Sequence, residues 1–299
     1  MALPRLILVT GKGGTGKSTV AAALAMALAR RRPTTLGDLD GRGSVARLIG
    51  ARLVGAAHET LEVIAITPRG ELEAFIDRIV PLRAVSRRML QSRTFGYVTA
   101  ALPGLEAFLM LERLRLMAGK AALEDRFAVI DAPATGHALE LLAVAKGIRK
   151  LAPTGTLHRL SSAVEEFLID RNRCGVMLTV TPEELALREA LEAAATLREL
   201  GIECVGAIVN TVPPALFTAA DIAKLGTVEA YARLAERRRE LNEFADRARD
   251  ELERAGIAVT ELPMLYEAAL GAEEVEALSR RLETELLETR SHEAESTNR

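Results

Sequence analysis

Short apolar runs alternate with longer stretches of helical periodicity along most of the chain. Apolar runs bounded by turn-forming residues predict buried strands, and apolar positions three and four apart predict helices. The first run, 6–9, leads into a glycine-rich turn and then into an alanine-rich helical stretch over 18–31. The same criteria predict six further strands, at 33–36, 61–66, 127–131, 175–180, 204–209 and 257–262.

This alternation predicts an α/β fold, in which helices flank a mostly parallel β-sheet on both faces. Two stretches depart from it. Residues from about 68 to 120 have helical patterns without a strand, which indicates a helical insertion. Residues 227–255 predict a long charged helix with a solvated face of i,i+4 ion pairs. We expect a single domain over 1–287 and a flexible polar tail over 288–299.

Composition and charge exclude several classes of protein. With 299 residues, of which 49% are hydrophobic and 27% charged, the chain can bury a large core. The formal net charge of -2 predicts no global attraction to nucleic acid or acidic lipid, although it leaves room for a local basic patch. We therefore expect no nucleic-acid binding and at most an indirect membrane contact. We expect neither a signal peptide nor a membrane span, and hence a cytoplasmic protein. The two cysteines, Cys174 and Cys204, are too few for a disulfide framework or a zinc site.

The strongest chemical signal is a phosphate-binding loop between the first predicted strand and helix. The pattern G-x-x-x-x-G-K-[ST] is filled by Gly11, Lys12, Gly13, Gly14, Thr15, Gly16, Lys17 and Ser18. Glycines let successive backbone N–H groups turn toward a phosphate chain, and the helix start adds a favourable dipole. Lys17 is expected to neutralise the β- and γ-phosphates, and the Ser18 hydroxyl to ligate Mg²⁺. Thr19, the next helical residue, is included in the predicted nucleotide site.

The second lysine of the loop produces the variant K-G-G-x-G-K-[ST]. This variant resembles the deviant Walker A group of P-loop ATPases, which includes MinD, ParA, the nitrogenase iron protein and the arsenite-pump and tail-anchored-protein-targeting ATPases. The resemblance implies a homodimer, or a heterodimer with a paralogue, that encloses ATP. Lys12 would then reach the partner's nucleotide and, with Lys17, act in catalysis, because a cation stabilises charge on the transferred phosphoryl group. A solvent-facing loop lysine is the alternative interpretation of Lys12.

A second motif, D-A-P-A-T-G-H over 131–137, resembles a segment of the arsenite-pump and tail-anchor-targeting ATPases. Asp131 ends an apolar strand, as a Walker B aspartate does, and is expected to hold Mg²⁺ through water. Gly136 and His137 would lie in switch II, although a lone histidine is more often structural. The resemblance spans roughly residues 5–285 and is strongest to the short bacterial arsenite-ATPase-like proteins of the SIMIBI class.

Two aspartates follow the second predicted strand, at the edge where a parallel sheet binds ligands. The resemblance assigns Asp40 to switch I, where it would orient the attacking water, and Asp38 to the metal shell. The run 40–43 is also compatible with a simple turn. Relatives usually have proline directly after this aspartate, whereas this chain has Gly41, so we expect switch I to move differently.

The resemblance also assigns two positions to the adenine base. Asn210 ends a predicted strand where relatives read the edge of adenine with an asparagine, whose amide offers both a donor and an acceptor. A helix cap or a turn is the alternative role for Asn210. Pro263 belongs to the segment 262–266, which resembles one that packs along the base.

Taken together, the resemblance implies an ATP- and Mg²⁺-dependent ATPase that dimerises and acts as a conformational switch for an unidentified protein partner or client. Two alternatives stay open: a weakly hydrolysing regulatory scaffold in a paralogue heterodimer, and a targeting factor for tail-anchored membrane proteins. Targeting needs an adaptable apolar groove. The insertion offers apolar residues for such a groove or for a helical core, namely Met89, Leu90, Phe95, Phe108, Leu109, Met110, Leu114 and Met117.

Three other activities of related ATPases fit the sequence poorly. Metalloid sensing needs a cluster of soft thiolates, and an iron–sulfur reductase needs cysteines between its switch segments. Cys174 and Cys204 cannot supply either arrangement. Positioning on DNA or membrane would call for a basic amphipathic C-terminal helix, but the stretch 273–288 is acidic.

Overall fold

The computed structural model describes residues 3–39, 43–50, 60–79, 104–151, 153–225, 229–266 and 270–288. Within these ranges one sheet has the strand order β3-β2-β4-β1-β5-β6-β7, and all its pairings are parallel. The strands are β1 (Leu6–Gly11), β2 (Thr34–Asp38), β3 (Leu61–Ala65), β4 (Phe127–Asp131), β5 (Cys174–Val180), β6 (Cys204–Val212) and β7 (Val259–Pro263). The predicted α/β fold is confirmed, and every predicted strand is present with its ends shifted by a few residues at most.

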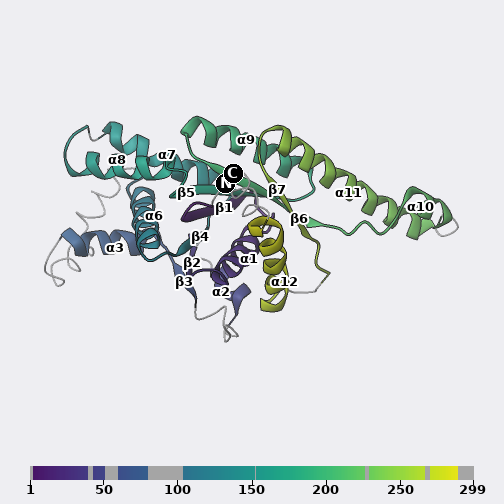
Figure 1. Ribbon diagram of the computed structural model, residues 1–299. Coiled ribbons are helices and arrows are strands. Elements are labelled where there is room, and N and C mark those ends of the chain that lie inside the picture. The colour runs from purple at the N-terminus through teal and green to yellow at the C-terminus, as the bar shows by residue number, and fades with distance from the viewer. Residues whose placement is uncertain are drawn as a thin grey trace, which may run out of the picture.

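Helices cover both faces of the sheet (Figure 1). One face packs against α1 (Lys17–Ala29), α2 (Ser44–Ile49) and α12 (Ala272–Leu282), which continues as a π-helical turn, η1 (Glu283–Glu288). The other face packs against α6 (Leu105–Leu123), α7 (Thr135–Leu151), α8 (Gly155–Ile169), α9 (Glu184–Leu200) and α11 (Glu229–Arg254). The helix α3 (Pro68–Ile79) contacts α6, and α10 (Ala219–Leu225) contacts α11.

The apolar run of β1 explains the two-layer core. Leu6 and Leu8 belong to the hydrophobic cluster beneath α6 to α9, and Ile7 and Val9 belong to the cluster beneath α1. Successive side chains of a strand point to opposite faces of the sheet. A strand that is covered on both faces therefore has a continuous run of apolar residues in its sequence. Helix α1 is buried from Thr19 to Ala29 because it lies between the sheet and α12. Its alanine-rich sequence without a polar face follows from that position.

The apolar residues of the predicted insertion that the structure describes differ in how deeply they are buried. Phe108, Leu109, Met110 and Leu114 are buried on α6 in the core that faces the sheet. For these four residues the core interpretation is therefore confirmed, and they supply no client groove. Met117 is only partly buried, at the end of α6 that borders a surface hollow. Met89, Leu90 and Phe95 lie outside the described residues, and the division of the chain into one domain with an insertion stays a prediction.

The predicted long charged helix is α11. Its i,i+4 ion pairs join Arg233 to Glu229 at 3.7 Å and Arg239 to Glu243 at 2.6 Å, as the solvated-face interpretation expects. The predicted tail begins with Glu288, which is the last residue of η1, and the remainder of that tail lies outside the described residues. None of the helices in the described ranges is both long and apolar enough to span a bilayer.

The buried thiol of Cys174 generates a first testable prediction. Cys174 is fully buried at the start of β5, and burial raises the pKa of its thiol to about 12. Because the thiolate is the reactive form, iodoacetamide at pH 8 should leave Cys174 unmodified in the folded protein while the partly exposed Cys204 reacts. Peptide mass spectrometry measures both sites, and complete labelling of both in urea is the control. Fast labelling of Cys174 in the folded protein would contradict the prediction.

Candidate functional site

The glycine-rich loop connects the end of β1 to the start of α1. Gly14 and Gly16 have φ angles of 90° and 84°, in the left-handed region that side chains with a Cβ avoid. The backbone N–H of Thr15 donates to the carbonyl oxygen of Lys12 at 3.3 Å, and the Thr15 hydroxyl donates to the same oxygen at 2.9 Å. These bonds close a tight turn directly before Lys17, the first residue of α1.

Side chains from two distant strands hold this loop from below. The hydroxyl of Thr179 on β5 lies 2.8 Å from the hydroxyl of Thr15, and it donates to the carbonyl oxygen of Thr10 at 3.3 Å. On β6, the amide Nδ2 of Asn210 donates to the carbonyl oxygen of Thr15 at 3.0 Å. Thr15, Thr179 and Asn210 are all buried, so these polar contacts replace hydrogen bonds to water. The loop is therefore positioned by the sheet beneath it.

Three side chains with oxygen atoms that could bind a metal ion lie on the side of the loop that faces β4 and β2. The Ser18 hydroxyl donates to Oδ2 of Asp131 at 2.6 Å. Asp131 and Asp38 end neighbouring strands in register with each other and are only 1% and 4% exposed. The backbone N–H of Gly43 donates to Oδ2 of Asp38 at 3.1 Å. A hydroxyl and two carboxylates are the hard oxygen ligands that Mg²⁺ prefers, so these residues fit the predicted ion.

Ser18, Asp38 and Asp131 would need further ligands to complete the coordination shell of a metal ion. Within the described ranges, no group of three or more His, Cys, Asp or Glu side chains could hold a metal ion. Mg²⁺ is usually bound by one or two protein oxygens together with substrate phosphates and water. The arrangement therefore suits a cation that arrives with a phosphate chain.

The other residues that the sequence assigns to the nucleotide site lie in the P-loop, in α1, in β7 and in the segment after β2. The amine of Lys17 donates to the carbonyl oxygen of Lys12 at 3.4 Å, and Lys12 itself is partly buried. Thr19 is buried within α1, and Pro263 is the exposed last residue of β7. Asp40 and Gly41 lie outside the described residues. The roles assigned to these residues stay predictions.

Asn210 and His137 have contacts that the sequence did not indicate. The Asn210 amide is engaged with the loop backbone, so the side chain has a structural task whether or not it also reads adenine. His137 lies at the start of α7 with its side chain 80% exposed, 3.4 Å from Glu140. Both the structural role and the sensing role of His137 stay predictions.

Sequence reasoning missed two threonines of the site. Thr10 donates from its hydroxyl to the carbonyl oxygen of Pro133 at 2.8 Å, which ties β1 to the segment after Asp131. Thr179 supports the loop as described above. Neither residue belongs to a recognisable motif, and a threonine at the end of an apolar strand carries no special signal. Only the pairing of β1 with β4 and β5 brings their partners together.

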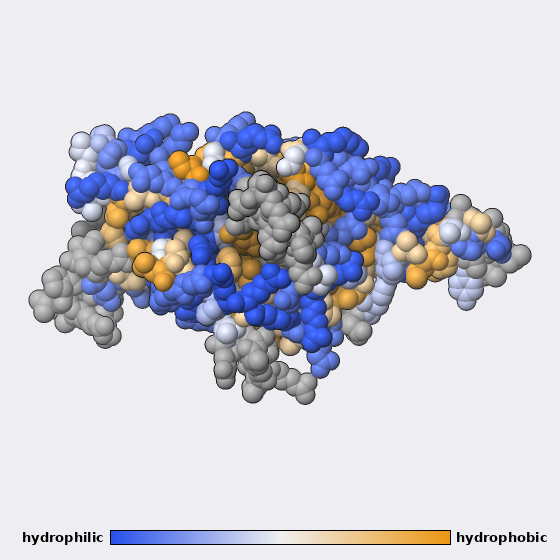
Figure 2. All heavy atoms as spheres, in the orientation of Figure 1, coloured by the Kyte–Doolittle hydropathy of each residue, from blue (hydrophilic) through white to orange (hydrophobic). Residues whose placement is uncertain are grey.

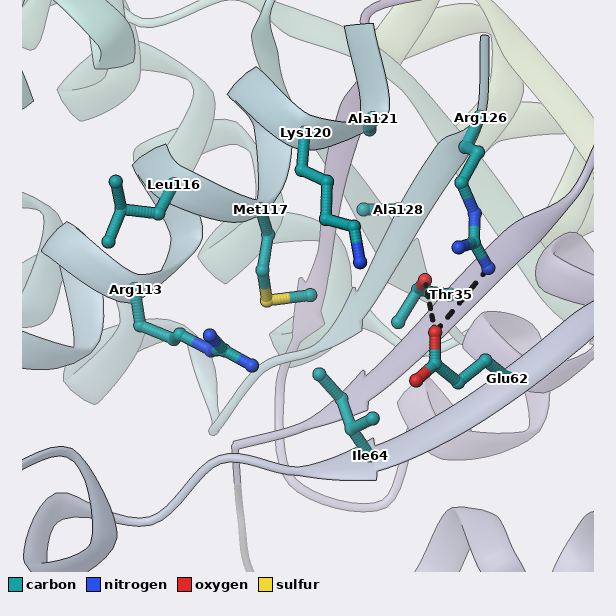
Figure 3. Close-up of a pocket in the computed structure, with 10 residues that line it drawn as sticks. All are labelled: Thr35, Glu62, Ile64, Arg113, Leu116, Met117, Lys120, Ala121, Arg126 and Ala128. Carbon is teal, nitrogen blue, oxygen red and sulfur yellow. Dashed lines mark hydrogen bonds and ion pairs between the residues drawn. The ribbon is translucent and has the colours of Figure 1, made fainter. Parts of the chain in front are cut away.

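A separate hollow lies away from the loop, between α6 and strands β2 to β4. Figure 3 shows Arg113 and Lys120 of α6 and Arg126 around it, with Glu62 on the opposite wall. Glu62 accepts hydrogen bonds from Arg126 and Thr35, each at 3.4 Å. None of the predicted nucleotide-site residues that the structure describes lines this hollow.

Comparison with known proteins agrees with the loop geometry. The sequence profile of the anion-transporting ATPases matches residues 4–154 and 152–284. The chain belongs to this family. ATPase BagA of Mycobacterium tuberculosis is 32% identical over 245 residues, which cover 76% of this chain and 71% of that protein. The arsenical pump-driving ATPase of Escherichia coli is 29% identical over 216 residues, which cover 69% of this chain and 34% of that protein.

Membership of the anion-transporting ATPase family defines the chemistry of the loop at a coarse level. The family resemblance predicted from the motifs is confirmed, including the similarity to short bacterial members. The chain is a P-loop ATPase-family protein, and its glycine-rich loop has the sequence pattern of a P-loop.

Gly16 provides a test of how the sheet holds the P-loop. A Cβ added at Gly16 would lie 2.3 Å from Nδ2 of Asn210, on a backbone with positive φ. Gly16→Ala should therefore lower the free energy of unfolding of the nucleotide-free protein by about 1–3 kcal/mol. The matched control is Gly13→Ala, where nothing lies within 4 Å of an added Cβ, and its effect should stay below about 0.5 kcal/mol. Equal urea midpoints for the two variants would contradict this account.

Proposed function

We propose that this protein binds and hydrolyses Mg-ATP and that the nucleotide switches its conformation to control a protein partner. The observation that carries the proposal is the 2.6 Å contact between the Ser18 hydroxyl and Asp131 beside the P-loop. It joins the first turn of α1 to the end of β4, so a phosphate chain with Mg²⁺ at the loop would change both elements at once.

Each predicted residue has a defined task in this proposal. Backbone N–H groups of the loop hold the phosphates, and the amine of Lys17 neutralises the β- and γ-phosphate charge. Ser18, Asp38 and Asp131 hold Mg²⁺, directly or through water; the bound ion would neutralise charge that develops on the phosphates. Asp40 orients the attacking water, and Lys12 acts in the site of a second protomer. Asn210 and Pro263 border the base.

The switch would act through the segment that follows Asp131. The carbonyl oxygen of Pro133 accepts from Thr10, and helix α7 begins at Thr135, two residues later. A change in the contact between Ser18 and Asp131 therefore reaches α7 through a short, hydrogen-bonded connection. A contact that has two alternative arrangements can convert a small local change into movement of a helix.

A regulatory scaffold that binds ATP without appreciable turnover is the second candidate. It is favoured by one sequence feature, Gly41 directly after Asp40, where relatives usually have proline. In this version the catalytic work belongs to a paralogue in a heterodimer.

The two candidates differ in the concentration dependence of ATP hydrolysis. If two protomers complete each site, the specific activity of the wild type should rise with protein concentration. Lys12→Ala and Asp40→Asn should each lower kcat by about 100-fold or more, because each removes a group needed in the transition state. Lys150→Ala, at an exposed position of α7, is the control and should behave as the wild type. ATP binding without turnover at any concentration would favour the scaffold instead.

The metal assignment is tested by the effect of Mg²⁺ on ATP affinity. The wild type should bind ATP about tenfold more tightly with Mg²⁺ than with EDTA, because Asp131 would help to hold an ion that neutralises phosphate charge. Asp131→Asn should remove most of this difference, since an amide is a weaker ligand than a carboxylate. Asp250→Asn, an exposed position of α11, should retain it. Isothermal titration calorimetry measures all six combinations of protein and metal condition, and an unchanged Mg²⁺ effect in Asp131→Asn would contradict the assignment.

A further inference from the structure

An apolar groove lies beyond the P-loop, between α11 and the segments that follow β6 and β7. Its volume is about 450 Å³. Five large apolar side chains that line it are exposed to solvent, namely Phe217, Tyr231, Leu234, Met264 and Tyr266. Figure 2 shows hydrophobic surface on the arm that α10 and the start of α11 form at the right of the molecule. Isolated exposed apolar residues are common in proteins, but several in one groove indicate an interaction surface.

The sequence of α11 explains why this surface is uncovered in a single chain. Positions alternately three and four apart form one continuous stripe: Tyr231, Leu234, Arg238, Leu241, Ala245, Ala248 and Leu252. The C-terminal part of the stripe, from Ala245 onward, is buried in the core that covers the sheet. At the other end, Tyr231 and Leu234 are 61% and 66% exposed. A stripe with this spacing is typical of a helix that packs against another helix, and only half of it has a partner within the described residues.

The charge of the groove restricts what can bind there. Its lining includes two arginines, Arg237 and Arg238, and no acidic residue. The Arg238 guanidinium stacks 5.0 Å above the Tyr266 ring and donates to the carbonyl oxygen of Pro214 at 3.3 Å. Neither arginine has a carboxylate partner among the described residues, whereas Arg233 and Arg239 of the same helix are paired with glutamates. The groove therefore combines apolar surface with two guanidinium groups that have no ion-pair partner in the part of the chain that the structure describes.

We propose that this groove binds an amphipathic helix of a partner protein whose apolar stripe is flanked by acidic side chains. The apolar stripe of the partner helix would cover Tyr231 and Leu234, and the carboxylates of the partner helix would pair with Arg237 and Arg238. A second copy of this chain fits less well. In a two-fold interface the groove would face itself and bring Arg237 and Arg238 of the two copies together.

The groove is joined directly to the nucleotide loop. The backbone N–H of Met264 donates to the carbonyl oxygen of Val212 at 2.8 Å, so the two segments that line the groove are fixed to each other. Val212 lies two residues after Asn210, which holds the P-loop at Thr15. This inference rests on the protein-partner part of the proposed function, for which it names the surface and the chemistry of the partner.

Synthetic peptides test the proposal without knowledge of the natural partner. One probe is a fluorescent helical peptide of about 18 residues, with leucines at i, i+3 and i+7 flanked by glutamates, and its twin has lysine at every glutamate position. Fluorescence anisotropy measures binding to the full-length, nucleotide-free protein. The wild type should bind the acidic peptide about tenfold or more tightly than the basic twin. Arg237→Glu should abolish this preference, and Leu234→Asp should abolish binding of the acidic peptide.

Controls keep the outcome interpretable. Leu185→Asp introduces the same charge at an exposed leucine of α9, 55% exposed, and should bind as the wild type. Circular dichroism checks that every variant is folded. Equal affinity for the two peptides, binding of neither peptide, or an equal loss in Leu185→Asp would overturn the proposal. Analytical ultracentrifugation tests the other occupant. If the wild type is a dimer and Leu234→Asp dissociates it, a second copy occupies the groove and the proposal is overturned. Because no nucleotide is present, a protein that hydrolyses ATP but fails this test refutes only the groove.

Discussion

The arrangement of the site depends on the contact between the P-loop and the strands beneath it. The loop passes over β5 and β6 so closely that Gly11 and Gly16 have no room for a Cβ: Thr179 occupies the space beneath the first and Asn210 the space beneath the second. Asn210 also donates to the carbonyl oxygen of Thr15, which fixes the loop to the sheet just before α1 begins at Lys17. A loop that is already ordered loses less conformational entropy when it binds a phosphate chain.

The order of the strands explains why the other groups of the site meet. β1 is central, with β4 on one side and β5 on the other, and β2 is the next strand beyond β4. In an all-parallel sheet the carboxyl ends share one edge, so Asp38, Asp131 and Asn210 arrive there from three separate strands. The contact between Ser18 and Asp131 then joins the helix after the P-loop to the strand that precedes α7.

Strand β6 connects this edge to the proposed partner surface. Asn210 faces the loop, and two residues later Val212 is bonded to Met264, which lines the groove beside α11. Helix α11 itself serves two purposes, since its C-terminal half covers the sheet and its N-terminal half extends beyond it (Figure 1). An occupant of the groove would therefore contact the element that supports the nucleotide loop. This proximity provides a physical route between the two proposed activities.

Local sequence patterns were enough to predict the strands, the main helices, the P-loop and the family. These features follow from local patterns: apolar runs, glycine spacing, and Asp131 at the end of a strand. The folded chain was needed to show that Thr179 and Asn210 hold the loop, that Phe108 and Leu114 are core, and that Arg237 and Arg238 border a groove. Thr15 and Thr179 are 164 positions apart, and no pattern in either segment records their contact. Such contacts arise from strand register and helix packing, which join residues whose own neighbours in the chain carry no sign of the partner.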